Sequence, residues 1–184
     1  MNQRVITHSV FFGLYPGREA AAALAAAQRR LQHGFGVRTG LMLPDRLHVS
    51  LFGLAEQPRS PSPSLVAEIG RAVSRLEMGA FRIAFDTMTS FRGRRGARPA
   101  VLIGDEGVTG VSWLADKIRA ALLDVGLEGW RSTTPHLTLA WSDIVVPETP
   151  VAPVMWTARE FVLIDSFQGA GRHDVLGRWP LRGA

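Results

Sequence analysis

The chain has 184 residues, of which 46% are hydrophobic, and a formal net charge of +5 at pH 7. This size and composition suffice for one folded domain over residues 1–184 and exclude a globally disordered chain. The absence of cysteine excludes disulfides, iron–sulfur clusters and a cysteine nucleophile, and no apolar run approaches the ~20 residues that cross a bilayer. Because residues 1–5 lack the apolar stretch of a signal peptide, we expect a cytoplasmic protein.

Nearly all of the positive charge is arginine, since Lys117 is the only lysine. The planar guanidinium group binds phosphate at two points, which suits a polyanionic partner. Arginine and alanine also rise together in GC-rich genomes whatever the function. The sequence pI of about 11.1 therefore indicates a polyanionic partner only modestly.

The hydrophobic pattern predicts strands and helices along the whole chain. In the first half we expect a strand over 5–14, a helix over 18–33 capped by Gly34, a strand over 47–54, a helix over 65–76 and a strand over 81–86. In the second half we expect a strand over 99–104, a helix over 111–125 with Trp113, Ile118, Leu122 and Val125 on its buried side, and strands over 135–141, 161–167 and 174–181. Stretches rich in Gly, Pro, Ser or Arg predict loops at 36–40, 57–64, 90–98 and 126–134.

Two of the predicted strands carry nearly the same short segment: His-Val-Ser-Leu at 48–51 and His-Leu-Thr-Leu at 136–139. Because strand side chains alternate, His48 shares a face with Ser50, and His136 shares a face with Thr138. One imidazole can take a proton while the other gives one, and the hydroxyls can hold phosphate oxygens. The two units predict a metal-free acid/base phosphodiesterase.

The surroundings of the two units also match. Each follows a strand, a helix and a loop, with 34 positions between Leu14 and His48 and 32 between Gly104 and His136. This repeat suggests an internal duplication. Two lobes related by a pseudo-two-fold axis would place the histidine strands side by side across a cleft.

Competing chemistries have weaker support. His48 and His136 with Asp45 or Asp143 could bind zinc, but the chain has no H-x-H or H-x-x-x-H spacing, so we expect no required metal. The chain also lacks the G-x-S-x-G elbow of a serine hydrolase. The remaining histidines, at positions 8, 33 and 173, are interpreted as structural or solvated.

Five further side chains are candidate substrate contacts. They are Phe12, Phe91, Arg92, Arg131 and Trp141. The segment 90–98 carries four arginines beside Phe91 and can be either an RNA-contacting loop or a solvated connection. Of the two adjacent phenylalanines on the first strand, one should face the core, and Phe12 is taken as the one that faces the cleft.

The paired motifs resemble those of the two-histidine (2H) phosphoesterases, specifically the bacterial 2'-5' RNA ligase-like, or RNA 2',3'-cyclic phosphodiesterase, branch. The resemblance covers almost the whole chain, from the opening residues 10–14 and the motifs at 47–51 and 135–139 to the tail at 161–166 and 175–181. Two positions depart from the family. Trp141 stands where a basic residue often follows the second motif, and Gly53 stands where a bulkier residue is frequent.

The resemblance implies an α+β fold with two lobes, in which two antiparallel sheets form a central cleft and helices pack outside. It implies metal-independent opening of an RNA 2',3'-cyclic phosphate to a 2'-phosphate, with a weak reverse 2'-5' ligation. In this reaction His48 is the proton donor, His136 is the general base, and Ser50 and Thr138 bind the phosphate. No cofactor is expected, because neither a P-loop nor a G-x-G-x-x-G motif is present.

Other substrates and a rival class stay open at this stage. The same chemistry could act on 2'-5' oligonucleotides or on cyclic phosphates of nucleotides or ADP-ribose derivatives. The rival is a non-catalytic RNA-binding protein, which would lose affinity with its loop arginines and show no turnover.

Overall fold

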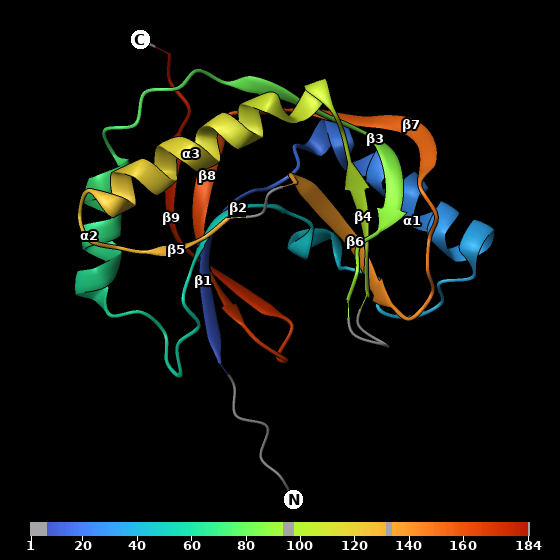
Figure 1. Ribbon diagram of the computed structural model, residues 1–184, viewed down its shortest axis with the longest axis horizontal. Coiled ribbons are helices and arrows are strands. Elements are labelled where there is room, and N and C mark those ends of the chain that lie inside the picture. Colours follow the sequence, from blue (N-terminus) through green and yellow to red (C-terminus); the bar gives the residue numbers. More distant parts are fainter. Residues whose placement is uncertain (1–6, 94–97, 132–133, 184) are drawn as a thin grey trace, which may run out of the picture.

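The computed structural model describes residues 7–93, 98–131 and 134–183 (Figure 1). In this part of the chain, helices are present beside strands whose pairings are all antiparallel, which places the fold in the α+β class. The strands are β1 His8–Leu14, β2 Val49–Leu54, β3 Phe81–Ser90, β4 Arg98–Ile103, β5 Gly129–Trp130, β6 His136–Ser142, β7 Thr149–Ala158, β8 Glu160–Phe167 and β9 Arg172–Pro180. The helices are α1 Ala21–Phe35, α2 Pro63–Val73 and α3 Thr109–Leu123, with short 3-10 helices η1 Arg18–Ala20, η2 Pro44–Arg46 and η3 Glu106–Val108.

The strands form two antiparallel halves that meet in the middle of the molecule. The order is β7-β3-β4-β6-β2-β1-β8-β9, with β5 added beside β2. The first four strands form one lobe and the last four the other, as Figure 1 shows on its right and left sides. The predicted two-sheet arrangement is confirmed, with one addition: β2 and β6 pair at Val49–Leu137, so the two sheets join edge to edge.

Helices cover the outside of both lobes, and they do so crosswise. The helix α1 follows β1 in the chain but packs on β7 and β6 of the other lobe, while α3 follows β4 and packs on β2 and on α2 (Figure 1). Each strand–helix–strand unit therefore starts in one lobe, covers the other with its helix, and returns to the centre with its histidine strand. This exchange ties the two lobes together.

The duplication extends to a detail of the two histidine strands. Each strand contains a β-bulge, and the extra residue is the leucine that ends the motif, Leu51 in β2 and Leu139 in β6. A bulge shifts the alternation of side chains by one position and re-aims those beyond it. Both leucines are buried, so the shift leaves the core intact while it changes which later residues face outward.

Several predicted boundaries and one predicted face differ from the structure. The helix α2 spans Pro63–Val73 and not 65–76, and β3 extends to Ser90 and does not end at 86. The first helix runs through Gly34 and ends at Gly36, whose φ of 74° is the left-handed cap that glycine allows. On α3 the prediction for Trp113 is wrong, because its side chain is 65% exposed. Val125 lies beyond the helix and is also exposed. The face that packs inward repeats every three or four residues and consists of Val111, Leu114, Ala115, Ile118 and Leu122.

The strand β7 escaped prediction altogether. It carries Pro150 and Pro153, which normally argue against a strand because proline cannot donate to the hydrogen-bond ladder. In the fold β7 is the edge strand of its lobe and pairs only with β3 among the described residues, so its prolines can face away from the partner. Among the described helices, none combines the length and apolar character needed to span a membrane.

Candidate functional site

The pairing of β2 with β6 brings the two motifs together. Val49 and Leu137 are register partners, and both are fully buried on the core side. Residues on either side of this pair point to the opposite face, and the antiparallel register places position 48 opposite 138 and position 50 opposite 136. Each histidine therefore lies across from the hydroxyl residue of the other motif. The four candidate side chains converge on one face at the junction of the lobes.

Both histidines are oriented in the same way by their own backbone. Nδ1–H of His48 donates to the carbonyl of Arg46 at 2.7 Å, and Nδ1–H of His136 donates to the carbonyl of Thr134 at 2.9 Å. A carbonyl oxygen only accepts, so the hydrogen of each neutral ring is on Nδ1 and the lone pair is on Nε2. The pseudo-symmetry thus produces two imidazoles that present the same nitrogen for proton transfer.

Burial makes both imidazoles hard to protonate in the free protein. It lowers the pKa of His48 to about 4, with further lowering by the positive charges of His173, Arg46 and His136. Burial also lowers the pKa of His136 from its ordinary value of 6.5. An anion between them would favour protonation of one ring.

The two hydroxyl residues differ from their buried neighbours. Ser50 and Thr138 are half-buried, while the residues before and after each of them are buried. Neither hydroxyl has a hydrogen-bond partner within 7–93, 98–131 and 134–183. Hydroxyls in this position can donate to the oxygens of a bound phosphate.

A third histidine, interpreted from the sequence as structural or solvated, lies beside this site. The ring of His173 on β9 is edge-on to that of His48, with centroids 5.3 Å apart. Phe11 contacts both rings, with its centroid 4.9 Å from His48 and 5.9 Å from His173. His173 has no motif around it, and it reaches the site only because β9 pairs with β8 and β8 with β1.

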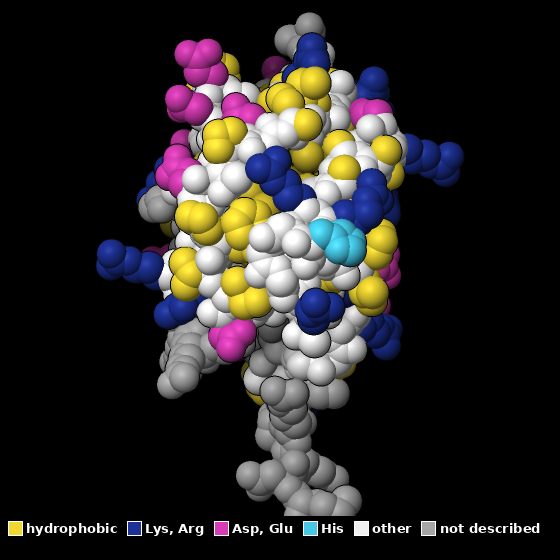
Figure 2. All heavy atoms as spheres, turned by 90° about the vertical axis from the view of Figure 1, so that its right-hand side faces the viewer, with side chains coloured by type: hydrophobic (Ala, Val, Ile, Leu, Met, Phe, Trp, Pro, Cys, Tyr) yellow, Lys and Arg dark blue, Asp and Glu magenta, His cyan; other side chains and the backbone are white. Residues whose placement is uncertain are grey.

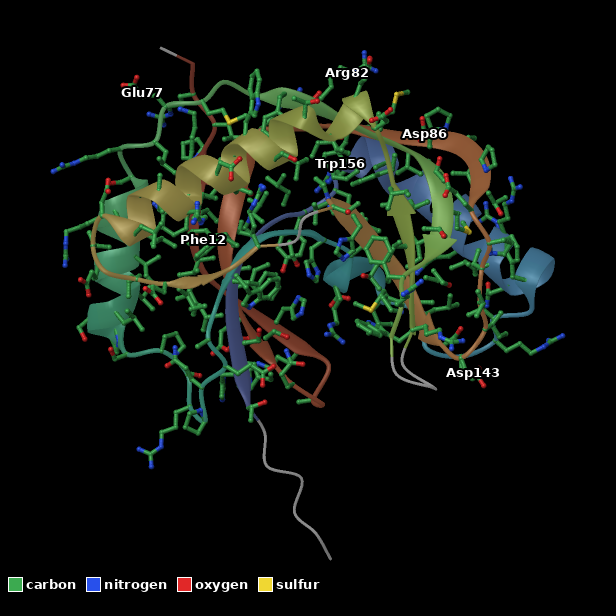
Figure 3. The ribbon with its side chains drawn as sticks, viewed as in Figure 1. Phe12, Glu77, Arg82, Asp86, Asp143 and Trp156 are labelled. Atoms are coloured by element: carbon green, nitrogen blue, oxygen red, sulfur yellow. The ribbon has the colours of Figure 1, made fainter. Side chains whose placement is uncertain are left out.

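The prediction for Phe12 is wrong. Its side chain is fully buried and packs on Phe161 and Trp179, on the side of β1 that faces α2 and α3 (Figure 3). The adjacent Phe11 points the other way, toward His48. Because side chains alternate along a strand, one of the two phenylalanines must face the core and the other the histidines. The sequence does not determine which of them faces the core.

Phe91, predicted as a substrate contact, lies beside the second histidine. Its ring meets that of His136 edge-on, with centroids 4.9 Å apart. The adjacent Arg92 is exposed. The prediction of an arginine-rich RNA-contacting loop over 90–98 falls partly on residues 94–97, which lie outside the described residues.

The last two candidate contacts differ in their surroundings. Arg131 forms an ion pair with Asp116 of α3, with Nη1 and Oδ1 3.2 Å apart, so its guanidinium group is held toward the helix. Trp141 is 49% exposed while Ala140 and Ser142 beside it are buried. The bulge at Leu139 explains this orientation, because it turns position 141 onto the face that carries the second motif.

The departure at Gly53 also has a structural cause. Position 53 is five residues after the first histidine, as Trp141 is after the second. The indole ring of Trp130 lies directly over Gly53, where a Cβ atom would overlap the ring. Gly53 pairs with Phe11, so this half-exposed indole lies beside Phe11 on the side of the sheet that carries His48. Trp130 was not among the predicted contacts, because the loop before the second motif hid the short strand β5.

The remaining histidines have other roles. His8 donates Nδ1–H to both carboxylate oxygens of Asp165, at 2.9 and 3.0 Å, in a buried ion pair between β1 and β8. His33 is exposed in the last turn of α1, where a positive charge suits the helix dipole. Across the described ranges, no three His, Asp or Glu side chains are grouped so that they could hold a metal ion, and neither Asp45 nor Asp143 joins the paired histidines in such a group.

Among the described residues, the face of the molecule that carries α1 and β7 shows no continuous basic patch (Figure 2). Lysine and arginine side chains stand apart there, with hydrophobic and neutral side chains between them. The arrangement that matters is local, namely two equally oriented imidazoles and two hydroxyls at the junction of the lobes. Such a set can transfer protons to and from a bound phosphate ester.

The chain matches the family model of the 2'-5' RNA ligase superfamily over residues 16–166, which is more than half of its length. Among solved structures it is similar to E. coli LigT in complex with 3'-AMP, with 21% identity, a TM-score of 0.74 and coverage of 95% of this chain and 98% of that one. A structure described as a phosphoesterase matches with 20% identity, a TM-score of 0.74 and coverage of 95% and 99%.

A protein from Thermus thermophilus, TT0787, matches with 27% identity, a TM-score of 0.69 and coverage of 95% and 98%. No curated protein sequence matches this chain. The structural likenesses confirm the bilobal α+β fold, and the family match includes both histidine motifs. The chain belongs to the 2'-5' RNA ligase superfamily, with the fold of the LigT-like 2H phosphoesterases.

Proposed function

We propose that this protein is a metal-independent RNA 2',3'-cyclic phosphodiesterase that opens a terminal 2',3'-cyclic phosphate to a 2'-phosphate. The observation that carries the proposal is the pair of imidazoles, each with Nδ1–H held by a backbone carbonyl and its lone pair on Nε2. Ser50 and Thr138 lie across from these rings with half-exposed hydroxyls. A pair of acid/base groups and two phosphate ligands is the minimum set for this reaction.

The reaction needs one protonated and one neutral imidazole. Neutral His136 takes a proton from water as the water oxygen attacks phosphorus in line with the bond to O3'. That P–O3' bond breaks, and protonated His48 gives its proton to O3', leaving a phosphomonoester on O2'. Ser50 and Thr138 donate hydrogen bonds to the non-bridging oxygens, which carry additional charge in the transition state.

The same groups can join two RNA ends. The 5'-hydroxyl of a second RNA attacks phosphorus in place of water and gives its proton to His136, the P–O3' bond breaks, and His48 protonates O3', which leaves a 2'-5' linkage. In the reverse step O3' attacks, the 5'-oxygen leaves, and the two histidines exchange their proton-transfer roles. The family description, which names 2'-5' RNA ligation, supports this joining step. The E. coli relative whose structure contains 3'-AMP supports a ribose phosphate as the ligand.

The decisive assay uses an RNA oligomer that ends in a 2',3'-cyclic phosphate, incubated with the protein in EDTA. We expect turnover to an RNA with a terminal 2'-phosphate, identified by its resistance to an enzyme that removes only 3'-phosphates. Unchanged oligomer would contradict the proposal, and a 3'-phosphate product would contradict the proposed leaving group. Tight binding of the oligomer without turnover would favour the non-catalytic RNA-binding class.

The lowered histidine pKa values predict an acid-shifted pH profile. The active form carries one proton on the pair, so kcat/KM is highest between the two apparent pKa values of the free enzyme. Burial and cationic neighbours bring the pKa of His48 to about 4, and burial brings the pKa of His136 below 6.5. We expect the maximum of kcat/KM below pH 6.5, with a fall of about tenfold per pH unit well above it.

The measurement is kcat/KM on a cyclic-phosphate substrate from pH 4 to pH 9. The pKa of His173 is also lowered to about 4, by burial and by the nearby Arg46, while Asp45 acts in the opposite direction. On the acidic side of the pH profile, protonation of His173 therefore overlaps with protonation of His48. The variant His173→Gln removes the first of these titrations and leaves that of His48. A maximum above pH 7 would contradict the predicted ionisation of the pair.

A further inference from the structure

A pocket of about 820 Å³ lies between the start of α1, the 3-10 helix η2 and β9. Its lining is unusually rich in guanidinium groups and contains a single carboxylate, that of Asp45. The four arginines are Arg18, Arg46, Arg172 and Arg178. Guanidinium groups bind phosphate and carboxylate at two points, so this lining favours an anion. The acid/base pair itself does not line the pocket.

The pocket and the histidine pair share a wall. His173 lines the pocket, and its ring is 5.3 Å from the ring of His48. Arg46 also lines the pocket, and its carbonyl accepts the hydrogen bond from Nδ1 of His48 at 2.7 Å. The pocket thus lies next to His48. A ligand with two anionic groups can therefore occupy both places at once.

Two buried donors in this wall lack acceptors. Nη2 of Arg46 donates to Nε2 of His173 at 3.4 Å, so Nε2 is the acceptor nitrogen and Nδ1 of the neutral ring carries the hydrogen. Nδ1 of His173 and Nε of Arg46 are both buried without a hydrogen-bond partner in the described part of the chain. Buried N–H groups in folded proteins nearly always have an acceptor. An anionic oxygen held by this wall would supply one.

The four arginines are not equally engaged. Arg172 donates from Nε to Asp174 at 2.8 Å, and Arg178 pairs with Glu160, so both charges are already balanced. Arg18 is exposed and has no ion pair with any residue in the described ranges. Arg18 and Arg46 are thus the two guanidinium groups with charge left for a ligand.

We propose that this pocket binds a second phosphate of the substrate, the one on the 5' side of the nucleoside that carries the cyclic phosphate. The inference rests on the proposed function, because it places the cyclic phosphate between His48 and His136. It names the substrate class more closely: a cyclic-phosphate end that is followed by at least one further phosphate. Arg18 and Arg46 bind that phosphate, and His173 separates it from the reacting one.

The test compares two substrates that differ by one phosphate, a nucleoside 2',3'-cyclic phosphate and its 5'-phosphorylated form. The readout is the ratio of their kcat/KM values. Because hydrogen bonds to charged groups are strong, we expect the added 5'-phosphate to raise kcat/KM about tenfold or more, mainly through KM. A dinucleotide with a cyclic end, which carries its second phosphate as a diester, should show a similar gain and extends the result to RNA.

Matched variants locate the effect. Arg18→Ala and Arg46→Gln should each bring the ratio toward one. Arg30→Ala removes the same charge from an exposed position of α1 that does not line the pocket, and it should keep the wild-type ratio. A wild-type ratio near one, or a ratio that is equally affected by Arg18→Ala and Arg30→Ala, would overturn the inference alone. No turnover of either substrate would overturn the proposed function and the inference with it.

Discussion

Replacing either His48 or His136 with alanine is expected to lower kcat for an RNA 2',3'-cyclic phosphate by about 10²–10⁴-fold, the usual contribution of a general acid or base. Each ring donates a hydrogen bond to a backbone carbonyl two residues upstream, and its replacement by alanine removes a proton-transfer group from the junction of the lobes. KM should change little, because Ser50 and Thr138 still bind the phosphate.

The control for this pair is His33→Ala, which removes an exposed imidazole at the end of α1 and should leave kcat unchanged. All three variants are checked for an unchanged thermal unfolding midpoint. The double variant His48→Ala/His136→Ala should be little worse than either single variant, because groups that act as one unit are not additive. Activity that survives both single substitutions would show that the acid/base pair lies elsewhere.

The site was predictable from the sequence to the extent that local periodicity determines it. A histidine and a hydroxyl two positions apart on a strand must share a face, and two such strands in matching contexts had to come from a duplication. The pairing of Val49 with Leu137 confirms that the two units meet. The two bulges could not be predicted. The extra residue of each is the leucine that ends the motif, and in the sequence this leucine looks like any other core residue.

The rest of the site depends on contacts between distant elements. His173 is 125 positions from His48 in the chain and reaches it through the order β1, β8, β9, which the sequence leaves open. Phe11 and Phe12 have the same chemistry, so only the position of the core decides that Phe11 faces the site. In the sequence Gly53 is only a departure from the family, and the structure shows its cause, because the indole of Trp130 lies where a side chain at position 53 would be.

These long-range contacts also break the symmetry of the two histidines. Burial lowers the pKa of His48, and Arg46 adds positive charge beside that ring, while for His136 the cause of the lowered pKa is burial. In the free protein, a single proton shared by the two histidines is therefore less favourable on His48 than on His136. For His48 to be the donor, as we propose, the negative charge of the bound phosphate must raise the pKa of His48 in the complex. The two assignments give the same bell-shaped profile, so pH dependence alone does not separate them.

A substrate that needs no general acid separates them. In a cyclic phosphate whose leaving atom is sulfur in place of O3', the leaving group departs as a thiolate, because a thiol has a pKa of only about 8.5. His48→Ala should then lower kcat by less than about tenfold, while His136→Ala should keep its full loss of about 10²–10⁴-fold, since water must still be deprotonated. The measurement is single-turnover kinetics of each variant on the oxygen and sulfur substrates.

The comparison has a built-in control, because wild type and both variants are measured on the same two substrates and any general loss of binding affects both equally. Rescue of His136→Ala in place of His48→Ala would exchange the two roles and leave the two-histidine mechanism standing. In that case the positive charge beside His48 would have a catalytic role, because it would keep the His48 ring neutral and so make it the base. Rescue of neither variant would show that proton donation to the leaving group is not limiting, which would contradict the proposed acid.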